Sequence, residues 1–492
     1  MFDFESFFRQ FLYDPKSPLL FNNGFFVFFF AVFMSAYYLL RNNFPARKYL
    51  FCFFSLYFFY KASGIFVVFV ILSAIVDYFL SNAIYRQKNK RKKKWLLICS
   101  IVFNLGLLVY FKYTNFFIAT CNEILQTHFN PLNILLPVGI SFYTFENLSY
   151  TIDVYRGQFV PVRKFTDYLL FLSFFPKLVM GPIVRASDFI PQINKPFEIS
   201  ENDFAKGFYL IVSGLFKKLI ISDFITQNFV DYIFDDPSRY TGLECLFAVY
   251  GYAVVIYCDF SGYSDVAIGI AKWLGFTIPV NFKSPYQSKN ITEFWRRWHI
   301  SLSTWLRDYL YIPFGGNRKG VVRTYINLML TMLLGGLWHG ASWNFIAWGG
   351  LHGLALAFHK IWKQKTEKLF RTVHNTFFIN ALSVLVTFHF VCFCWIFFKA
   401  ADFTIAGDMI HQIFHDFDLS VFGAFFNNYK PVLGLMLLAY LLHSIPDDFA
   451  DKITGKLKKL PLVYYIGIFL MFVLLYGFFK SSEPVMPIYL RF

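Results

Sequence analysis

Apolar positions follow one another in long runs along this chain, and polar positions gather in the short stretches between the runs. Each run approaches the 20 or so residues that a helix needs to cross about 30 Å of hydrocarbon. The clearest runs are residues 25–40, 65–80, 96–111, 381–398 and 462–479. The pattern predicts an all-α polytopic membrane protein with about ten to twelve transmembrane helices.

The middle of the chain, from Pro176 to Gly320, has a different pattern. Its apolar pieces are short, and glycine, proline, arginine and aspartate interrupt them. Irregular backbone is tolerated at membrane depth only where protein buries it or water fills a cavity beside it. We therefore expect re-entrant or interfacial helices around a functional cavity. We expect a single membrane domain over residues 1–492, with peripheral N-terminal helices (1–135), a motif-bearing core (136–360) and C-terminal helices (361–492).

Basic residues set the expected orientation in the membrane. The formal net charge is +16, from 46 lysines and arginines against 30 acidic residues. These basic residues cluster in short loops, most clearly in RQKNKRKKK at residues 86–94, as cytoplasmic loops of membrane proteins do. The pattern favours a multi-pass protein of the cytoplasmic (inner) membrane with both termini on the extracytoplasmic side. It argues against a nucleic-acid partner, because the membrane loops account for the charge.

One apolar stretch, LLGGLWHGASWNFIAWGGLHG at residues 333–353, contains a histidine between a tryptophan and a glycine. Both flanks are close to a span and both outer ends are basic, so the chain is expected to turn near Trp338–Gly340. His339 would then lie at membrane depth, where an ionisable group is a functional candidate because its burial is costly. Burial keeps an imidazole neutral and able to accept a proton. A ring that merely bonds a backbone carbonyl remains the alternative.

The surroundings of His339 suggest how such a base would be used. Its glycines would admit a substrate close to the backbone, and its tryptophans would keep the base dry. Candidate substrate contacts near it are Trp338, Ser342, Trp343 and Asn344.

Other histidines carry weaker signals. His352 shares a helical stripe with His359, and packing is its expected role. His411 and His415 stand four residues apart, a spacing that can bind a metal. No third ligand lies near them in the sequence, so an exposed pair on a polar helix is favoured, and we predict no metal site.

Residues 284–318 predict a helix lying at the cytoplasmic interface. Asn290 followed by Glu293 has the form of a capping box, which starts a helix. His299 lies on this helix, beside a stripe of large apolar side chains that an interfacial helix would bury. The stripe consists of Trp298, Leu302, Trp305 and Tyr309.

Two arginines on the same predicted helix leave two interpretations open. Arg296 and Arg297 can anchor lipid headgroups, or with Trp298 they can hold the phosphates of a cytoplasmic donor.

A third polar group stands in YCDFSGYSDVAIG, at residues 257–269. It puts Asp259, Ser261 and Asp265 into a mostly apolar run. Paired carboxylates can do acid–base work, but a polar network that faces the cavity is the interpretation we favour.

At these residues the chain resembles the membrane-bound O-acyltransferase family, and within it the bacterial branch of alginate O-acetyltransferases. Five similar stretches run in the family's order: LPVGISFYTFENLSYTIDVYRG, FPKLVMGPIVRASDFIPQI, YCDFSGYSDVAIG, NITEFWRRWHISLSTWLRDYLYIPFGGNR and GLWHGASWNFIAWGGLHG. Weaker similarity continues at VCFCWIFFKAADF, residues 391–403.

The resemblance implies a ring of helices around a central tunnel that joins the two membrane faces. His339 occupies the position of the family's catalytic histidine, and His299 that of its second motif histidine. The resemblance implies transfer of an acyl group from a cytoplasmic thioester, with acetyl-CoA as the expected donor substrate and no bound cofactor. His299 would orient the donor or its thioester carbonyl.

The resemblance also implies partners. Proteins of this branch work with a separate extracytoplasmic, esterase-like acetyltransferase, and the expected final acceptor is an envelope polysaccharide. Two alternatives remain: D-alanyl transfer to teichoic acid from a charged carrier protein, and lipid or glycan transport without chemistry. The paired repeats typical of transporters are not evident in the sequence.

Overall fold

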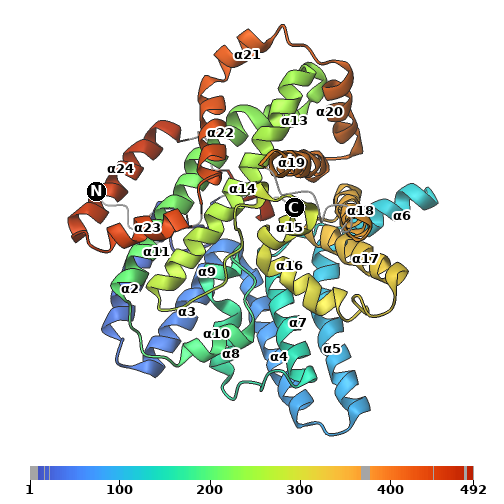
Figure 1. Cartoon of the computed structure of the whole chain (residues 1–492). Coiled ribbons are helices and arrows are strands. Elements are labelled where there is room, and N and C mark those ends of the chain that lie inside the picture. Colours follow the sequence, from blue (N-terminus) through green and yellow to red (C-terminus); the bar gives the residue numbers. More distant parts are fainter. Residues whose placement is uncertain are drawn as a thin grey trace. The chain divides into compact units, whose positions relative to one another are not determined.

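The computed structural model of the protein is built from helices (Figure 1). It describes residues 9–15, 17–21, 23–366, 377–446, 448–480 and 485–490, and within these ranges no β-strand is present. The predicted all-α class is confirmed. Both ends of the sequence lie outside the described residues, and their extracytoplasmic location stays a prediction.

Contacts along the chain divide it into two compact units. The first unit contains residues 1–207 and 266–279, and the second contains residues 208–265 and 280–492. The three sections predicted from the sequence have other bounds, and their grouping into one membrane domain stays a prediction.

The first unit contains the N-terminal helices. α3 ends at Ser63, and Gly64 then adopts a positive φ of 62°, which glycine tolerates without strain. The helices are α2 (Gly24–Leu39), α3 (Phe44–Ser63), α4 (Val67–Arg86), α5 (Lys90–Leu108), α6 (Thr114–Leu125), α7 (Ile140–Arg156), α8 (Phe165–Ser173), α9 (Phe175–Leu178) and α10 (Ala186–Ile193).

The second unit contains most of the sequence motifs. The helix α11 (Glu201–Leu215), which belongs to this unit from Phe208 onward, runs on through the π-helical stretch η3 (Phe216–Ser222) into α12 (Asp223–Ile225), η4 (Thr226–Val230) and α13 (Asp231–Asp235). The later elements are α14 (Gly242–Trp273), α15 (Ile291–Arg297), α16 (Ile300–Leu306), η7 (Arg307–Tyr311), α17 (Val321–His339), α18 (Trp343–Thr366), α19 (Phe377–Lys399), α20 (Phe403–His415), α21 (Phe422–Asn428), α22 (Lys430–His443), α23 (Asp448–Leu457), α24 (Leu462–Phe479) and the 3-10 turn η8 (Ile488–Leu490).

Among the described helices, six are long and apolar enough to cross a membrane. The pair α22 and α23, bent by 93°, is a seventh candidate. Two of the six candidates, residues 44–86 and 90–125, are 43 and 36 residues long. At 1.5 Å per residue each exceeds the hydrocarbon thickness of about 30 Å. The chain is a multi-pass membrane protein, and the expected total of ten to twelve crossings stays a prediction.

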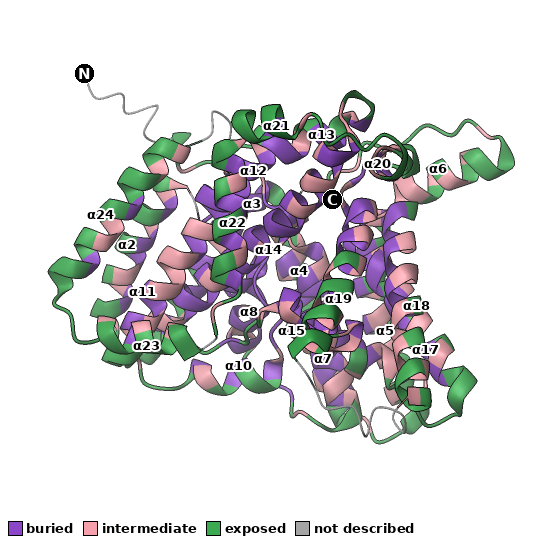
Figure 2. Cartoon of the chain, turned by 45° about the horizontal axis from the view of Figure 1, so that its top comes forward, coloured by how far each residue is buried: buried purple, intermediate pink, exposed green. Residues whose placement is uncertain are grey.

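Burial distinguishes inner from outer helices of the second unit (Figure 2). The apolar window of α14 is 72% buried by protein, whereas that of α24 is only 11% buried. Phe478 of α24, for example, is 85% exposed. Such an apolar surface is suited to contact with lipid or with another protein rather than with water.

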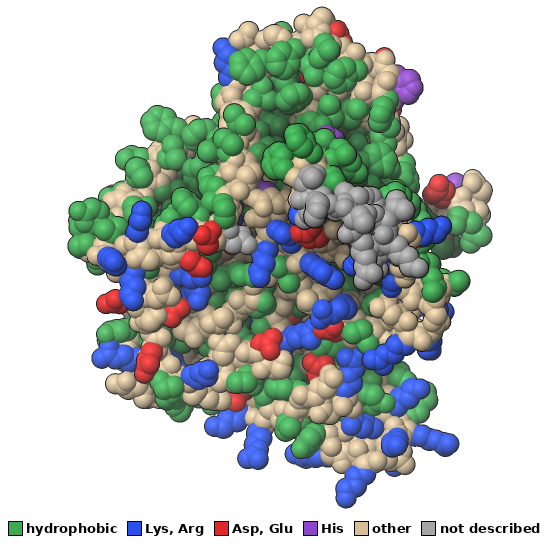
Figure 3. Space-filling model, viewed as in Figure 1, with side chains coloured by type: hydrophobic (Ala, Val, Ile, Leu, Met, Phe, Trp, Pro, Cys, Tyr) green, Lys and Arg blue, Asp and Glu red, His purple; other side chains and the backbone are tan. Residues whose placement is uncertain are grey.

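The basic loop between α4 and α5 is exposed. Lysine and arginine side chains are numerous on the face shown in Figure 3, and most residues of the run 86–94 are exposed. Exposure of this run fits the cytoplasmic loop that the charge pattern predicts.

Candidate active site

His339 is the last residue of α17, at the tip of a tight helical hairpin. Gly340, which follows it, is extended, and α18 begins three residues later at Trp343. The turn predicted near Trp338–Gly340 is therefore confirmed.

Glycines of this hairpin let its two helices approach closely. A Cβ atom at Gly336 would lie 2.2 Å from the carbonyl oxygen of Phe345, and one at Gly349 would lie 2.4 Å from that of Met332. A Cβ atom at Gly340 would collide with the Phe345 ring. The expectation that these glycines admit a substrate is wrong for these three positions, because the space beside them is filled by the hairpin itself.

Replacing Gly336 by alanine is expected to destabilise the hairpin, because the new methyl group has no room. Overpacking of this kind typically costs about 1–3 kcal/mol, and the measurement is the thermal unfolding temperature in detergent. Gly350→Ala is the matched control, since its Cβ atom would meet Leu333 at an ordinary 3.6 Å. An equal loss of stability in both variants would contradict the packing argument.

Aromatic rings enclose the imidazole of His339, of which only 2% is exposed. The ring centroids of Trp338, Trp348 and Phe398 lie 5.0, 4.9 and 5.3 Å from that of the imidazole. Two tryptophans therefore shield the ring as expected. Trp343 does not contribute, because it is 46% exposed.

The helix predicted to run through His299 is broken at that residue. The capping box is present, since Glu293 N–H donates to Asn290 Oδ1 at 2.9 Å and starts α15. However, α15 ends at Arg297, and His299 adopts a φ of 41° before α16 begins at Ile300. The single interfacial helix is therefore a wrong prediction. A positive φ is uncommon outside glycine and often marks a functional site.

The break turns His299 into the interior of the second unit. Its ring centroid lies 6.4 Å from that of His339 and 4.6 Å from that of Phe260. The residue is fully buried, and neither ring nitrogen has a hydrogen-bond partner among the residues that the structure describes. Burial lowers the pKa of His299 to about 3, so the ring is neutral at physiological pH.

A short segment near the end of the sequence also reaches these histidines. We name residues 485–490 the tail segment. The ring centroid of its Tyr489 lies 5.5 Å from that of His339, 6.1 Å from that of His299 and 6.0 Å from that of Trp338. Burial raises the pKa of Tyr489 well above the ordinary value of a phenol. The phenol therefore keeps its proton unless a base removes it.

Asp259, Ser261 and Asp265 belong to a polar network, as the sequence predicted. Lys218 of η3 pairs with Asp259 at 2.5 Å, and its neighbour Lys217 pairs with Asp265 and donates to Ser261. Burial alone would lower the pKa of Lys218, but nearby carboxylates outweigh burial and raise it. Asp259 also lines a cavity, whereas these contacts give Ser261 and Asp265 a structural role.

The remaining candidates are dispersed. Trp298 is buried against Trp395, with ring centroids 5.0 Å apart, and therefore has a packing role. Asn344 is buried and donates to the carbonyl oxygen of Ala400 at 2.9 Å. The other three lie toward the surface: Arg296, Arg297, which pairs with Glu293, and Ser342.

The other histidines occupy the places expected of them. His352 is fully buried, lies 4.7 Å from Trp348 by ring centroids, and accepts a hydrogen bond from Trp295 Nε1 at 3.3 Å. His411 and His415 are exposed. Within the described residues, no group of three or more histidine, cysteine or acidic side chains is arranged to hold a metal ion.

Sequence reasoning missed Tyr489 and Lys218. Tyr489 follows the last apolar run, and no spacing rule connects it with His339. Lys218 did leave a signal, because Lys217 and Lys218 interrupt the apolar run FYLIVSGLFKKLIISDFI. Charges in such a run are expected to pair with carboxylates on a neighbouring helix.

Comparisons with known proteins identify the family that this chain resembles. The model of the family described as "membrane-bound O-acyltransferase family" matches residues 160–401, which include His299, His339 and Lys218. Peptidoglycan O-acetyltransferase of Helicobacter pylori is 37% identical over 415 residues, covering 78% of this chain and 77% of the relative.

Two further relatives extend the comparison. Probable alginate O-acetylase AlgI of Pseudomonas aeruginosa is 39% identical over 406 residues, covering 80% of this chain and 75% of the relative. Teichoic acid D-alanyltransferase of Bacillus subtilis is 30% identical over 291 residues, covering 56% of this chain and 72% of the relative.

Proposed function

Because this chain belongs to the membrane-bound O-acyltransferase family, we propose that it transfers an acetyl group from a cytoplasmic thioester toward an extracytoplasmic polysaccharide. Acetyl-CoA is the donor substrate in this proposal, and the chain is an enzyme of the cytoplasmic membrane. The observation that carries the proposal is the enclosed imidazole of His339, which shares ring contacts with a second histidine and a phenol.

His339 is the general base of the reaction. One ring nitrogen removes the proton of an acceptor hydroxyl, and the oxygen then attacks the thioester carbonyl carbon. The new C–O bond forms as the C–S bond breaks, and the proton passes from the imidazolium to the departing thiolate. The products are an ester and a free thiol. An imidazole can act as a general base in this step when it is in its neutral form.

His299 stabilises the developing negative charge on the carbonyl oxygen. A buried ring with two unpartnered nitrogens costs free energy, typically about 1–3 kcal/mol per unsatisfied group, unless a ligand satisfies it. A neutral imidazole carries one N–H donor, and a thioester carbonyl is a fitting acceptor for it.

Tyr489 is the first acceptor hydroxyl in this proposal. Its phenol lies against the base, and its raised pKa means that a base must assist its attack. The resulting aryl ester is more reactive than an alkyl ester, which suits a relay to a further carrier. A separate extracytoplasmic, esterase-like acetyltransferase would then accept the group and pass it to the polysaccharide.

D-alanyl transfer to teichoic acid is the second candidate, because a D-alanyltransferase is among the relatives. The O-acetylating relatives are more similar over more of the chain, and this difference favours acetyl. Transport without chemistry is set aside, because the family consists of acyltransferases.

Donor binding distinguishes the two candidates. Acetyl-CoA at 100 times its dissociation constant is expected to stabilise the purified protein by about 2.7 kcal/mol, and CoA-free acetate should not. The measurement is thermal unfolding in detergent with each compound and with a D-alanylated carrier protein. Stabilisation by the carrier protein alone would overturn the acetyl donor and favour D-alanyl transfer.

A further inference from the structure

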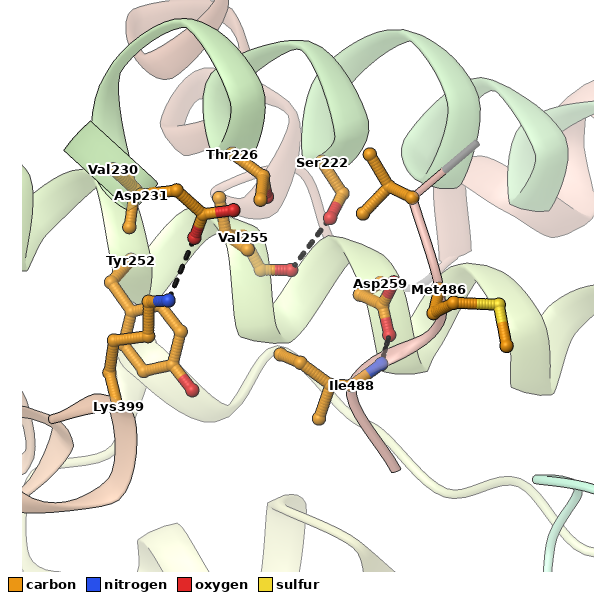
Figure 4. A pocket seen from close by; sticks show the side chains of 11 residues that line it. Ser222, Thr226, Val230, Asp231, Tyr252, Val255, Asp259, Lys399, Met486 and Ile488 are labelled. Atoms are coloured by element: carbon orange, nitrogen blue, oxygen red, sulfur yellow. Dashed lines mark hydrogen bonds and ion pairs between the residues drawn. The ribbon is translucent and has the colours of Figure 1, made fainter. Parts of the chain in front are cut away.

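Two buried side chains of the second unit, Asp259 and Lys218, hold the backbone of the tail segment. The N–H group of Ile488 donates to Asp259 Oδ2 at 3.0 Å (Figure 4). The ammonium group of Lys218 donates to the carbonyl oxygen of Val485 at 3.3 Å. Both bonds involve an ionised partner, and such bonds are about twice as strong as neutral ones.

The same two side chains hold each other. Lys218 Nζ lies 2.5 Å from Asp259 Oδ1 and 2.7 Å from Asp223 Oδ1. Lys218 and Asp259 are 4% and 2% exposed. Asp259 therefore uses one carboxylate oxygen for the ion pair and the other for the tail segment, which fixes the orientation of its side chain.

Consecutive residues of α14 hold consecutive residues of the tail segment. Asp259 binds the backbone of Ile488, and Phe260 packs on the ring of Tyr489 with centroids 4.7 Å apart. Phe260 also packs on His299 at 4.6 Å. This pairing sets the register in which Tyr489 meets the histidines.

The tail segment is not packed tightly on the side where it meets Asp259. A cavity of about 170 Å³ lies along it, lined by Val485, Met486 and Ile488 of the tail segment and by Asp259. Figure 4 shows the bond from Ile488 to Asp259 at the edge of this cavity. The cavity is large enough for several water molecules, so the two hydrogen bonds, rather than close packing, fix the segment on this side.

We propose that Asp259 and Lys218 are positioning residues, which hold the tail segment in the register that brings Tyr489 against His339. The inference rests on the proposed function, in which Tyr489 is the first acceptor. It assigns the carboxylate of Asp259 to the tail segment rather than to a donor or to acid–base chemistry.

Asp259→Asn tests the proposal, with Asp265→Asn as a matched control. Both carboxylates lie on α14 and pair with adjacent lysines of η3, but the ion pair of Asp265 is with Lys217 and not with Lys218. Labelled acetyl-CoA is the probe, and the rate of label transfer to Tyr489 is the measurement. Asp259→Asn is expected to lower that rate about ten- to a hundredfold, as loss of a charged hydrogen bond would. The KM of Asp259→Asn for acetyl-CoA is expected to stay unchanged. The transfer rate of Asp265→Asn is expected to stay within about twofold of the rate of the unsubstituted chain.

Hydrogen exchange provides a readout that does not depend on catalysis. In Asp259→Asn the backbone amides of the tail segment are expected to exchange about ten- to a hundredfold faster, because the segment detaches from α14 more often. In Asp265→Asn they should exchange at the rate of the unsubstituted chain. Unchanged exchange in folded Asp259→Asn would overturn the inference whatever happens to acetyl transfer.

If Asp259→Asn fails to fold, Ile488→Pro is the alternative test of the hydrogen bond between Ile488 and Asp259. Proline lacks the N–H group that binds Asp259, and it is tolerated at the first position of a helical turn; Ile488 begins η8. Ile488→Val keeps the N–H group and is the control. The proline variant is expected to lose transfer to Tyr489 about tenfold or more, with the valine variant unaffected; equal rates would overturn the inference. A different pair of results would contradict the proposed function instead. In that case the tail segment of Asp259→Asn exchanges faster, but the unsubstituted chain transfers no acetyl group to Tyr489.

Discussion

His339→Ala is expected to lower the rate of acetyl transfer by about 10²- to 10⁴-fold, the usual contribution of a general base. No other described imidazole is in ring contact with both Tyr489 and the enclosing Trp348. Water that enters the vacated space is a far weaker base than imidazole, so it replaces the lost function poorly. The measurement is transfer of labelled acetyl from acetyl-CoA in proteoliposomes, at matched amounts of folded protein.

His352→Ala is the matched control for this loss. It removes an equally large, fully buried ring that touches the same tryptophan, Trp348, at 4.7 Å between ring centroids. Both variants should lose similar thermal stability, but only His339→Ala should lose transfer. Retention of more than about a tenth of the transfer rate in His339→Ala would contradict a general base at this position.

Tyr489→Phe is expected to abolish transfer as completely as His339→Ala does, because the variant lacks the acceptor oxygen. The ring remains, so its packing on Phe260 and the fold of the tail segment should be unchanged. Acetyl-CoA should still stabilise the variant against heat. The measurement is again labelled acetyl transfer, together with thermal unfolding with and without acetyl-CoA.

Tyr286→Phe is the control for removal of a buried phenol oxygen. The Tyr286 hydroxyl donates to the carbonyl oxygen of Ala253 at 2.6 Å, so this variant should lose stability and keep transfer. If Tyr489→Phe transferred acetyl at the rate of the unsubstituted chain, the acceptor would have to be another hydroxyl. The role of His339 would then be tested only by its own substitution.

Signals confined to a few neighbouring residues predicted the structure well. The turn after His339 follows from glycines between two apolar runs, and the start of α15 follows from the spacing of Asn290 and Glu293. The exposed basic run at residues 86–94 follows from charge alone. In each case the cause of the local structure lies within one or two helical turns of sequence.

Features set by tertiary packing were not predictable in the same way. The apolar stripe through Trp298 and Leu302 continues at helical spacing across His299, yet the backbone breaks there because burial of the imidazole beside Phe260 overrides local periodicity. Contact between Tyr489 and His339 joins residues far apart in the sequence, and no periodicity encodes such a contact. The glycines of the hairpin were expected to admit a substrate, and only the structure shows that Gly336 and Gly349 serve helix packing instead.

The most direct measurement is a single-turnover reaction of the purified full chain with acetyl-CoA labelled in its acetyl group, followed by mapping of the label by mass spectrometry. We expect the label as an ester on Tyr489 in the unsubstituted chain, and no label on Tyr489 in His339→Ala within the same reaction time. Label on a different residue would contradict Tyr489 as the acceptor, and equal labelling of Tyr489 in both proteins would contradict activation of its hydroxyl by His339.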